Sequence, residues 1–189
     1  FTNQMMQARH EAMRKEKLDN LLSQLHAEKS PNRAMKILRK RDQLTFLLNN
    51  LELFRKADQL EKTVLFLYLR ENTPFSPGGD YTTWKHLFTV CDASQLKELG
   101  KPIPACKITG YRGSVTGKLR GLSWSIDREK VEWFLHRWRD KDQGGGIICS
   151  MEFAAEDIML LLDDDKHKEI IVNPEQMETN PLTEITALS

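Results

Sequence analysis

The sequence is poor in the residues that mark metal centres and disulfide frameworks. It has three cysteines, Cys91, Cys106 and Cys149, and none of them forms a C-x-x-C pair. An odd number of widely spaced cysteines supports neither a zinc site nor a disulfide framework and favours free cytosolic thiols. The five histidines are equally dispersed and no H-E-x-x-H motif occurs, so we expect no bound metal.

Long apolar runs are also missing. No run approaches the roughly 18 residues that a membrane-spanning helix needs. The longest candidate, residues 64–69, is flanked by Lys62 and Arg70 and is typical of a buried helix. A positively charged start followed by an apolar stretch, as in a secretory signal, does not occur either. We therefore expect a cytoplasmic protein with no membrane partner.

Net charge is nearly absent, but the charges are segregated along the chain. Ten basic and four acidic residues give +6 over 1–41, and nine basic and three acidic residues give +6 over 101–139. Residues 42–100 carry −2 and residues 140–189 carry −9, so the total is +1. Such segregation is typical of contact with a polyanion, but an acidic tail packed on a basic face would produce it as well. The sequence leaves both interpretations open.

Over almost all of the first 71 residues, apolar side chains recur at the spacing of an α-helix. Ser30 and Pro31 fit the cap and the first turn of a helix that restarts there, and a further helix is predicted over about 58–70. Residues 72–80, rich in Pro and Gly, form the clearest linker. The apolar stripes at helical spacing that support these helices are Leu18, Leu21, Leu22 and Leu25, then Leu44, Leu47, Leu48, Leu51 and Phe54.

After the linker the pattern changes from helices to short strands. Residues 84–88 suggest a helix, and Ser94 fits the cap of a short helix that ends at Gly100. A helix over about 127–139 has an inward stripe of Val131, Phe134, Leu135 and Trp138. We predict strands near 107–113, 122–125, 147–153 and 168–173, a helical piece at 154–162, and an irregular tail from Pro174.

Three short motifs carry the chemistry. Residues 110–114 read Gly-Tyr-Arg-Gly-Ser, and an Arg between two glycines suits close binding of an anion such as a phosphate. Residues 121–125 read Gly-Leu-Ser-Trp-Ser, a short strand in which alternation places Ser123 and Ser125 on one face and Trp124 on the other. Residues 168–174 read Lys-Glu-Ile-Ile-Val-Asn-Pro, where Glu169 opens a β-branched run.

Together these motifs resemble the Arg, Ser-x-Ser and Glu signature of the ADP-ribosyltransferase superfamily. Residues 121–127, followed by the helix with Glu132, are similar to the G-L-S-W-T-x-D pattern and following helix of prokaryotic and phage members. The resemblance covers about residues 107–174. It implies that Arg112 binds the phosphates or nicotinamide ribose of NAD, that Ser123 supports the ribose and the glutamate, and that Glu169 stabilises the oxocarbenium-like transition state.

The resemblance also implies roles for residues around these three. Gly113 would let the nicotinamide amide approach the main chain, and Ser125 would brace its strand within the cofactor site. Trp133 is a candidate to stack on the nicotinamide, whereas Phe134 is better explained by core packing. Members that modify arginine carry a second Glu two residues before the catalytic one. Here that position is His167, which would lie on the acceptor loop as a base or as an exposed loop residue.

The implied fold class is α+β. A helical region at 1–72 would bind an acceptor or partner, 73–106 would form a linker with short helices, and 107–189 would form an NAD-binding core. In the family, this core is a split mixed or antiparallel β-sheet with helices. The implied activity is NAD-dependent mono-ADP-ribosyl transfer by a toxin or antiphage-defence effector, without a metal.

The charge distribution indicates a class of acceptor and of partner, but not their identity. The basic run at 33–41 fits nucleic-acid phosphates, and it tilts the acceptor toward nucleic acid such as RNA rather than protein. A solvated helix face explains the same run. An antitoxin or inhibitor protein is a candidate partner for the helical region. Two other hypotheses are a non-enzymatic nucleic-acid- or protein-binding module with a degenerate transferase fold, and an NAD glycohydrolase.

Overall fold

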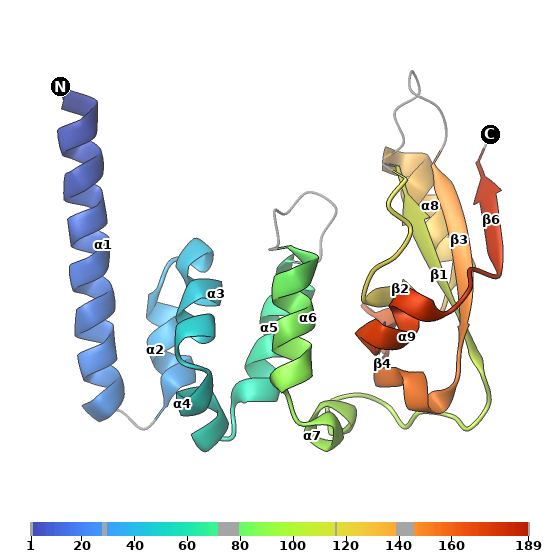
Figure 1. The fold of residues 1–189 in the computed structure, drawn as a ribbon, viewed down its shortest axis with the longest axis horizontal. Coiled ribbons are helices and arrows are strands. Elements are labelled where there is room, and N and C mark those ends of the chain that lie inside the picture. The colour runs from blue at the N-terminus through green and yellow to red at the C-terminus, as the bar shows by residue number, and fades with distance from the viewer. Residues whose placement is uncertain (1, 28–29, 72–79, 116, 139–145, 189) are drawn as a thin grey trace. The chain divides into compact units, whose positions relative to one another are not determined.

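The chain forms two compact units, Phe1–Ser76 and Pro77–Ser189. The computed structural model describes residues 2–27, 30–71, 80–115, 117–138 and 146–188, without the side chains of residues 2, 22, 24–27 and 138. Nearly all of the linker predicted at 72–80 lies outside these residues. Within them, no helix combines the length and apolarity that crossing a membrane requires. Helices occur in both units and strands in the second (Figure 1), so the α+β prediction is confirmed.

The first unit is helical, as its periodicity predicts. Ser30 stands at the N-cap of α2 and Pro31 at its first position, although the Ser30 side chain makes no capping hydrogen bond. Leu21 is buried, whereas Leu22 and Leu25 from the same predicted stripe lie outside the described side chains. The helices are α1 (Thr2–Ala27), α2 (Pro31–Ile37), α3 (Lys40–Asn49), α4 (Leu51–Lys56) and α5 (Leu60–Glu71).

Two helices open the second unit. The Asp80 side chain accepts a hydrogen bond from the backbone N–H of Thr83 and so caps α6 (Tyr81–Val90). Asp92 caps α7 (Ala93–Glu98) in the same way. The prediction that Ser94 caps this helix is wrong, because Ser94 lies inside it. The Asp92 carboxylate, two residues earlier, accepts the hydrogen bond from the Gln95 N–H.

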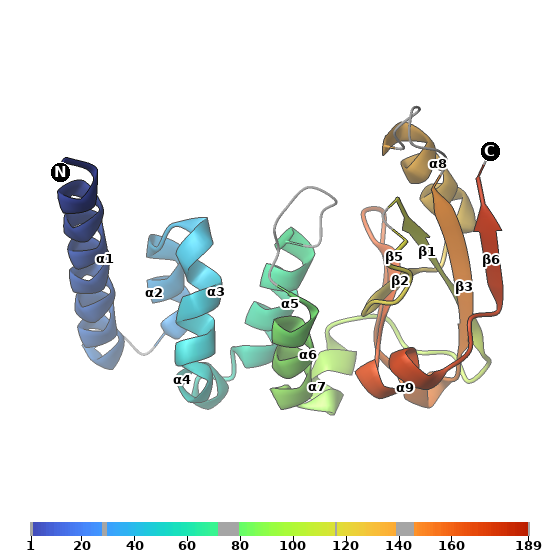
Figure 2. The same ribbon diagram turned by 45° about the horizontal axis from the view of Figure 1, so that its top comes forward.

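A six-stranded antiparallel sheet forms the rest of the second unit, in the order β4-β5-β2-β1-β3-β6 among the described residues. β1 and β3 pair over seven residues, but β1 and β2 pair only through Tyr111 and Ser125. The sheet is therefore continuous yet nearly divided between β1 and β2 (Figure 2). The strands are β1 (Ile108–Ser114), β2 (Ser123–Ser125), β3 (Ile147–Phe153), β4 (Ile158–Asp163), β5 (Lys168–Val172) and β6 (Glu184–Ala187).

Two predictions for the C-terminal third are wrong. The piece predicted to be helical at 154–162 is helical only in the short 3₁₀ helix η1 (Ala155–Asp157), and residues 158–162 belong to β4, which pairs with β5. The predicted irregular tail contains α9 (Pro174–Thr179) and β6. The Asn173 side chain accepts a hydrogen bond from the N–H of Glu175, so Asn173 and Pro174 begin a helix rather than end the structure.

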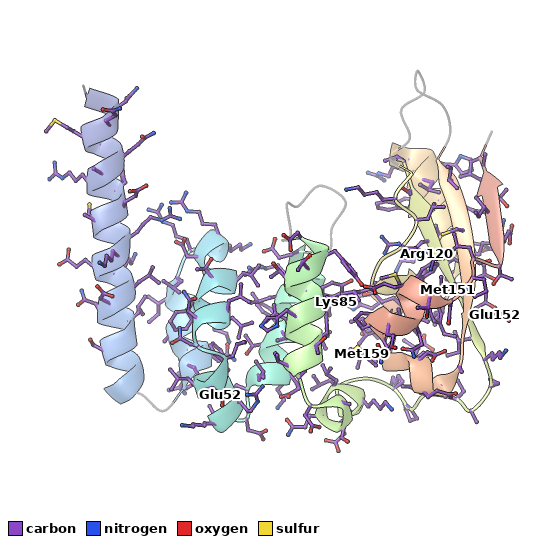
Figure 3. The ribbon with its side chains drawn as sticks, in the orientation of Figure 1. Glu52, Lys85, Arg120, Met151, Glu152 and Met159 are labelled. Atoms are coloured by element: carbon purple, nitrogen blue, oxygen red, sulfur yellow. The ribbon has the colours of Figure 1, made fainter. Side chains whose placement is uncertain are left out.

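The core of the second unit lies around Trp124, which is fully buried and packs edge-to-face on Phe153 with ring centroids 5.4 Å apart. Met177 of α9 belongs to the same cluster. Polar contacts also hold α9, since Arg120 donates to the Asn180 carbonyl and Lys85 reaches from α6 to Glu178 over 2.8 Å (Figure 3).

Helix α8 (Arg128–Trp138) packs against β1 from the sheet face to which Gly113 belongs. A Cβ atom on Gly113 would lie 2.8 Å from the side chain of Leu135, so the absence of a side chain permits this close packing. Of the stripe predicted for this helix, Leu135 is buried and Val131 and Phe134 are partly buried. The side chain of Trp138 lies outside the description.

Candidate active site

Three neighbouring strands carry Arg112, Ser123 and Glu169, although strand alternation puts the Arg112 side chain on the other face of the sheet from the side chains of Ser123 and Glu169. β2 carries Ser123 and lies between β1, which carries Arg112, and β5, which carries Glu169. Strand pairing thus brings together residues that are up to 57 positions apart in the sequence. A hydrogen-bonded chain connects all three, and Ser123 is its middle member.

The hydroxyl group of Ser123 donates to Oε2 of Glu169 over 2.8 Å. The register that pairs Ser125 with Glu169 and Ser123 with Ile171 puts both serines and Glu169 on the same face of the sheet. Ser123 is 7% exposed, and Glu169 is half-buried. A carboxylate in this setting is held in one orientation while keeping access to solvent, as a group that acts on a bound substrate requires.

Arg112 reaches Ser123 from the opposite side of β2. Because Tyr111 pairs with Ser125, alternation places Arg112 on the face of Trp124, and its guanidinium carbon lies 5.9 Å from the Trp124 ring. Its Nη1 donates to the Ser123 carbonyl oxygen over 2.8 Å. Arg112 and Glu169 therefore both contact Ser123, one through the main chain and the other through the hydroxyl group.

Gly121 makes room for the guanidinium of Arg112. A Cβ atom at this position would lie 2.5 Å from both Cζ and Nη1 of Arg112. The indole N–H of Trp124 donates to the Gly121 carbonyl over 2.8 Å and fixes this segment in place. The Gly-x-Ser-Trp pattern thus holds the Arg112 side chain beside Ser123, a function that the motif alone does not reveal.

Ser125 has a different role from Ser123. Its Oγ accepts from the Asp127 N–H at 3.1 Å and lies 3.0 Å from the Asp127 carbonyl oxygen and 3.3 Å from that of Lys168. These contacts fix the turn from β2 into α8. Ser125 thus contacts the turn and the neighbouring strand β5, whereas Ser123 contacts Arg112 and Glu169.

The other implied site residues are more dispersed. Trp133 is 60% exposed and stacks under Arg137, whose guanidinium carbon lies 5.3 Å from the ring centroid. It stands two positions from the buried Leu135, so it lies on the outer side of α8. Gly113 receives α8 through Leu135, which gives it a packing role.

His167 lies in the turn between β4 and β5, next to the strand that carries Glu169. The Asp164 carboxylate accepts hydrogen bonds from the N–H groups of His167 at 2.7 Å and Lys166 at 2.8 Å. These hydrogen bonds hold the pKa of Asp164 below its ordinary value. Nδ1 of His167 is 3.4 Å from Asp164 Oδ1. Asp164 therefore organises an exposed turn, and His167 is half-buried at the end of this turn.

A polar row that sequence reasoning missed crosses the face of Glu169. The directly paired residues Glu169, Ser125, Tyr111, Ser150 and Glu184 follow one another over five strands, from β5 to β6. Only register brings them into line, so no spacing in the sequence could have indicated the row.

Arg128 spans part of this row from the start of α8. Its Nη1 donates to both carboxylate oxygens of Glu184, at 2.9 and 2.8 Å, and its Nε to Glu132 at 3.0 Å. Its guanidinium carbon lies 5.9 Å from the centroid of Tyr111. Hydrogen bonds from Arg128, and then from Thr186, lower the pKa of Glu184. Arg128 thus ties β6 to α8 across the row.

Comparisons with known proteins add no assignment: no family model, curated protein or solved structure matches the chain.

Proposed function

We propose that the chain is an NAD-dependent mono-ADP-ribosyltransferase, a glycosyltransferase that uses NAD as its substrate. The observation that carries this proposal is that Arg112 and Glu169 both contact Ser123. Arg112 donates to its main-chain carbonyl oxygen, and the Glu169 carboxylate accepts from its hydroxyl group. A cation for the phosphates, a hydroxyl group and a carboxylate are the three groups that the reaction needs. They come from three neighbouring strands in the chain order of the family that the motifs resemble.

The reaction breaks the bond between C1′ of the ribose and the ring nitrogen of nicotinamide. The bonding electron pair leaves with that nitrogen, which cancels the positive charge of the ring, and positive charge develops on the ribose. The carboxylate of Glu169 stabilises this charge and binds the 2′-hydroxyl, while Ser123 holds the carboxylate in position. A nucleophile of the acceptor then bonds to C1′ and releases its proton, for which His167 is the candidate base.

The surrounding residues complete the proposed site. Arg112 supplies the positive charge that anchors the NAD phosphates. Gly113 lies beside it, but Leu135 of α8 packs closely on this glycine, so we assign it no contact with the nicotinamide amide. The outer position of Trp133 makes Tyr111, on the same face as Glu169, the better candidate to face the nicotinamide ring.

The acceptor that we favour is nucleic acid such as RNA, because the basic segments 1–41 and 101–139 attract a polyanion. Transfer onto a cellular macromolecule would suit a toxin or antiphage effector. The helical unit would then bind the acceptor or a neutralising partner.

The test incubates the protein with NAD labelled on its adenylate phosphate, together with RNA, DNA and protein from a cell extract. Label that nuclease or protease treatment releases identifies a transferase and its acceptor. Release of nicotinamide without any labelled macromolecule would instead identify an NAD glycohydrolase. Neither label nor nicotinamide release would identify a non-enzymatic binding module and contradict the proposal. Glu169→Gln should lose the reaction, and Glu156→Gln, an exposed glutamate on η1, is the matched control.

A further inference from the structure

A groove in the first unit lies between α1 and the segment that joins α2 to α3. It has a volume of about 680 Å³. One wall is a single face of α1, because residues 7, 10, 11, 14, 17 and 18 follow the helical spacing. The other wall runs from Leu38 to Asp42. The groove lies entirely in this unit and has no residue in common with the candidate active site.

Positive charge predominates in this groove. Four cations, Arg14, Lys17, Arg39 and Arg41, line it, against the carboxylates of Glu11 and Asp42. Asp42 is already engaged, since Arg14 Nη2 donates to its Oδ1 over 2.6 Å. An anionic ligand would therefore meet a surplus of cations from both walls.

The basic character continues outside the groove. Residues 33–41 contain five basic and no acidic side chains, and all five are exposed. Lys40 and Arg41 stand in the first turn of α3, where the helix dipole disfavours positive charge. Mutual repulsion and this position both cost stability, and a bound polyanion removes both costs. These basic residues are therefore more favourable with a polyanion bound than in the isolated chain.

The wall formed by α1 lacks the packing that would support it. Residues 3–17 are all exposed, including the apolar side chains of Met5, Met6 and Met13, so this part of the helix buries none of its faces. A helix of this kind gains little from tertiary contacts and benefits from a ligand along its length. Residues 7–18 span roughly 16 Å at 1.5 Å per residue, which is an elongated surface rather than a compact pocket.

We propose that this groove binds single-stranded RNA through its phosphate backbone. Arg39 and Arg41 on one wall and Lys17 on the other neutralise successive phosphates. The small number of apolar groups favours this occupant over an acidic protein helix. Among the described lining residues, Met13, Leu18 and Leu38 alone are apolar, and Leu38 is 7% exposed. A protein interface would need a larger apolar centre. This binding requires none of Arg112, Ser123 and Glu169.

The test measures fluorescence anisotropy of a labelled 20-nucleotide single-stranded RNA of mixed sequence against the full chain at several salt concentrations. The logarithm of the binding constant should fall with the logarithm of salt concentration, with a slope of about −0.7 for each phosphate neutralised. The double variant Arg39→Glu/Arg41→Glu should weaken binding roughly tenfold and reduce the magnitude of the slope by about 1.4, the contribution of two phosphates. Lys17→Glu, on the wall formed by α1, should also weaken binding, and this variant leaves α3 unaltered.

The matched control is Lys97→Glu/Lys101→Glu, which changes the net charge by the same amount at exposed sites of the second unit. It should bind RNA nearly as tightly as the unaltered chain, and so should Glu169→Gln, whether or not the protein is a transferase. Equal losses in both double variants would mean that only net charge matters and would overturn the proposal. Absence of salt-dependent RNA binding, or equal displacement of the RNA by poly-glutamate, would overturn it too.

Discussion

Ser123 donates its hydroxyl hydrogen to Oε2 of Glu169 over 2.8 Å, although the two residues are 46 positions apart in the chain. The carbonyl oxygen of the same serine accepts from Arg112. Ser123 therefore links the cation and the carboxylate on which the proposed chemistry depends. This dual contact distinguishes it from Ser125 and leads to the first prediction.

Replacing each serine by alanine should separate activity from stability. Ser123→Ala removes the group that orients Glu169, so nicotinamide release should fall by roughly 10- to 100-fold, with little change in Tm. Ser125→Ala loses the contacts that fix the turn into α8, so it should lower the free energy of unfolding by about 0.5–1.5 kcal/mol and keep most activity. Thermal unfolding and NAD turnover of both variants check this. The reverse pattern would show that the two roles are assigned the wrong way round.

One added methyl group should disturb the position of Arg112. In Gly121→Ala the new Cβ would lie 2.5 Å from the guanidinium carbon, which has to move away from the Ser123 carbonyl. We expect KM for NAD to rise about tenfold or more, the effect of losing a hydrogen bond to a charged group. Steady-state kinetics with varied NAD concentration measure this change.

Gly117→Ala is the control for that variant. No atom of the described residues lies within 4 Å of a Cβ at this position, but its φ of +86° is unfavourable for a residue with a side chain. The variant should lose about 1 kcal/mol of stability and retain its KM. A normal KM in Gly121→Ala, or a raised KM in Gly117→Ala, would speak against the proposed role of Arg112.

The sequence predicted the strands of the site better than the rest of the sheet. The strands predicted near 107–113, 122–125, 147–153 and 168–173 agree with β1, β2, β3 and β5 to within about a residue. Glycines and a proline punctuate these segments, and period-two alternation marks β2. The prediction for residues 158–162 was wrong because Ile-Met-Leu-Leu-Leu is a short apolar run. In such a run, periodicity cannot distinguish a buried strand from a helix.

The candidate site was predictable in its residue types but not in its geometry. Chain order and motif identity were enough to select Arg112, Ser123 and Glu169. The role of Gly121 depends on where the Arg112 side chain turns, and the alignment of Glu184 with Glu169 depends on the register of five strands. β6 is only four residues long, and its alternation between half-buried and exposed residues buries none of them, so its pairing with β3 left no clear signal in the sequence.

The ion pair between Arg128 and Glu184 should make stability depend on pH on the acid side. Because the pKa of Glu184 is lowered from 4.5 in the folded chain, the pair stabilises the fold above that value. This contribution is lost as the pH falls through the folded-state pKa. Glu184→Gln should therefore lower Tm at neutral pH and have a smaller effect at about pH 3.

Thermal unfolding at the two pH values measures that difference. The double variant Arg128→Ala/Glu184→Gln provides the control, since Glu184→Gln should add little once Arg128 has been removed. A Tm difference that is the same at both pH values would contradict the ion-pair explanation.

The most direct test of the proposed activity compares NAD binding and nicotinamide release in Glu169→Gln with those of the unaltered chain. The amide keeps the size of the carboxylate and can still accept from Ser123, but it carries no negative charge. Kd for NAD by calorimetry should change by less than about threefold, while nicotinamide release should fall by about 10²- to 10³-fold. Turnover at the rate of the unaltered chain would contradict the account.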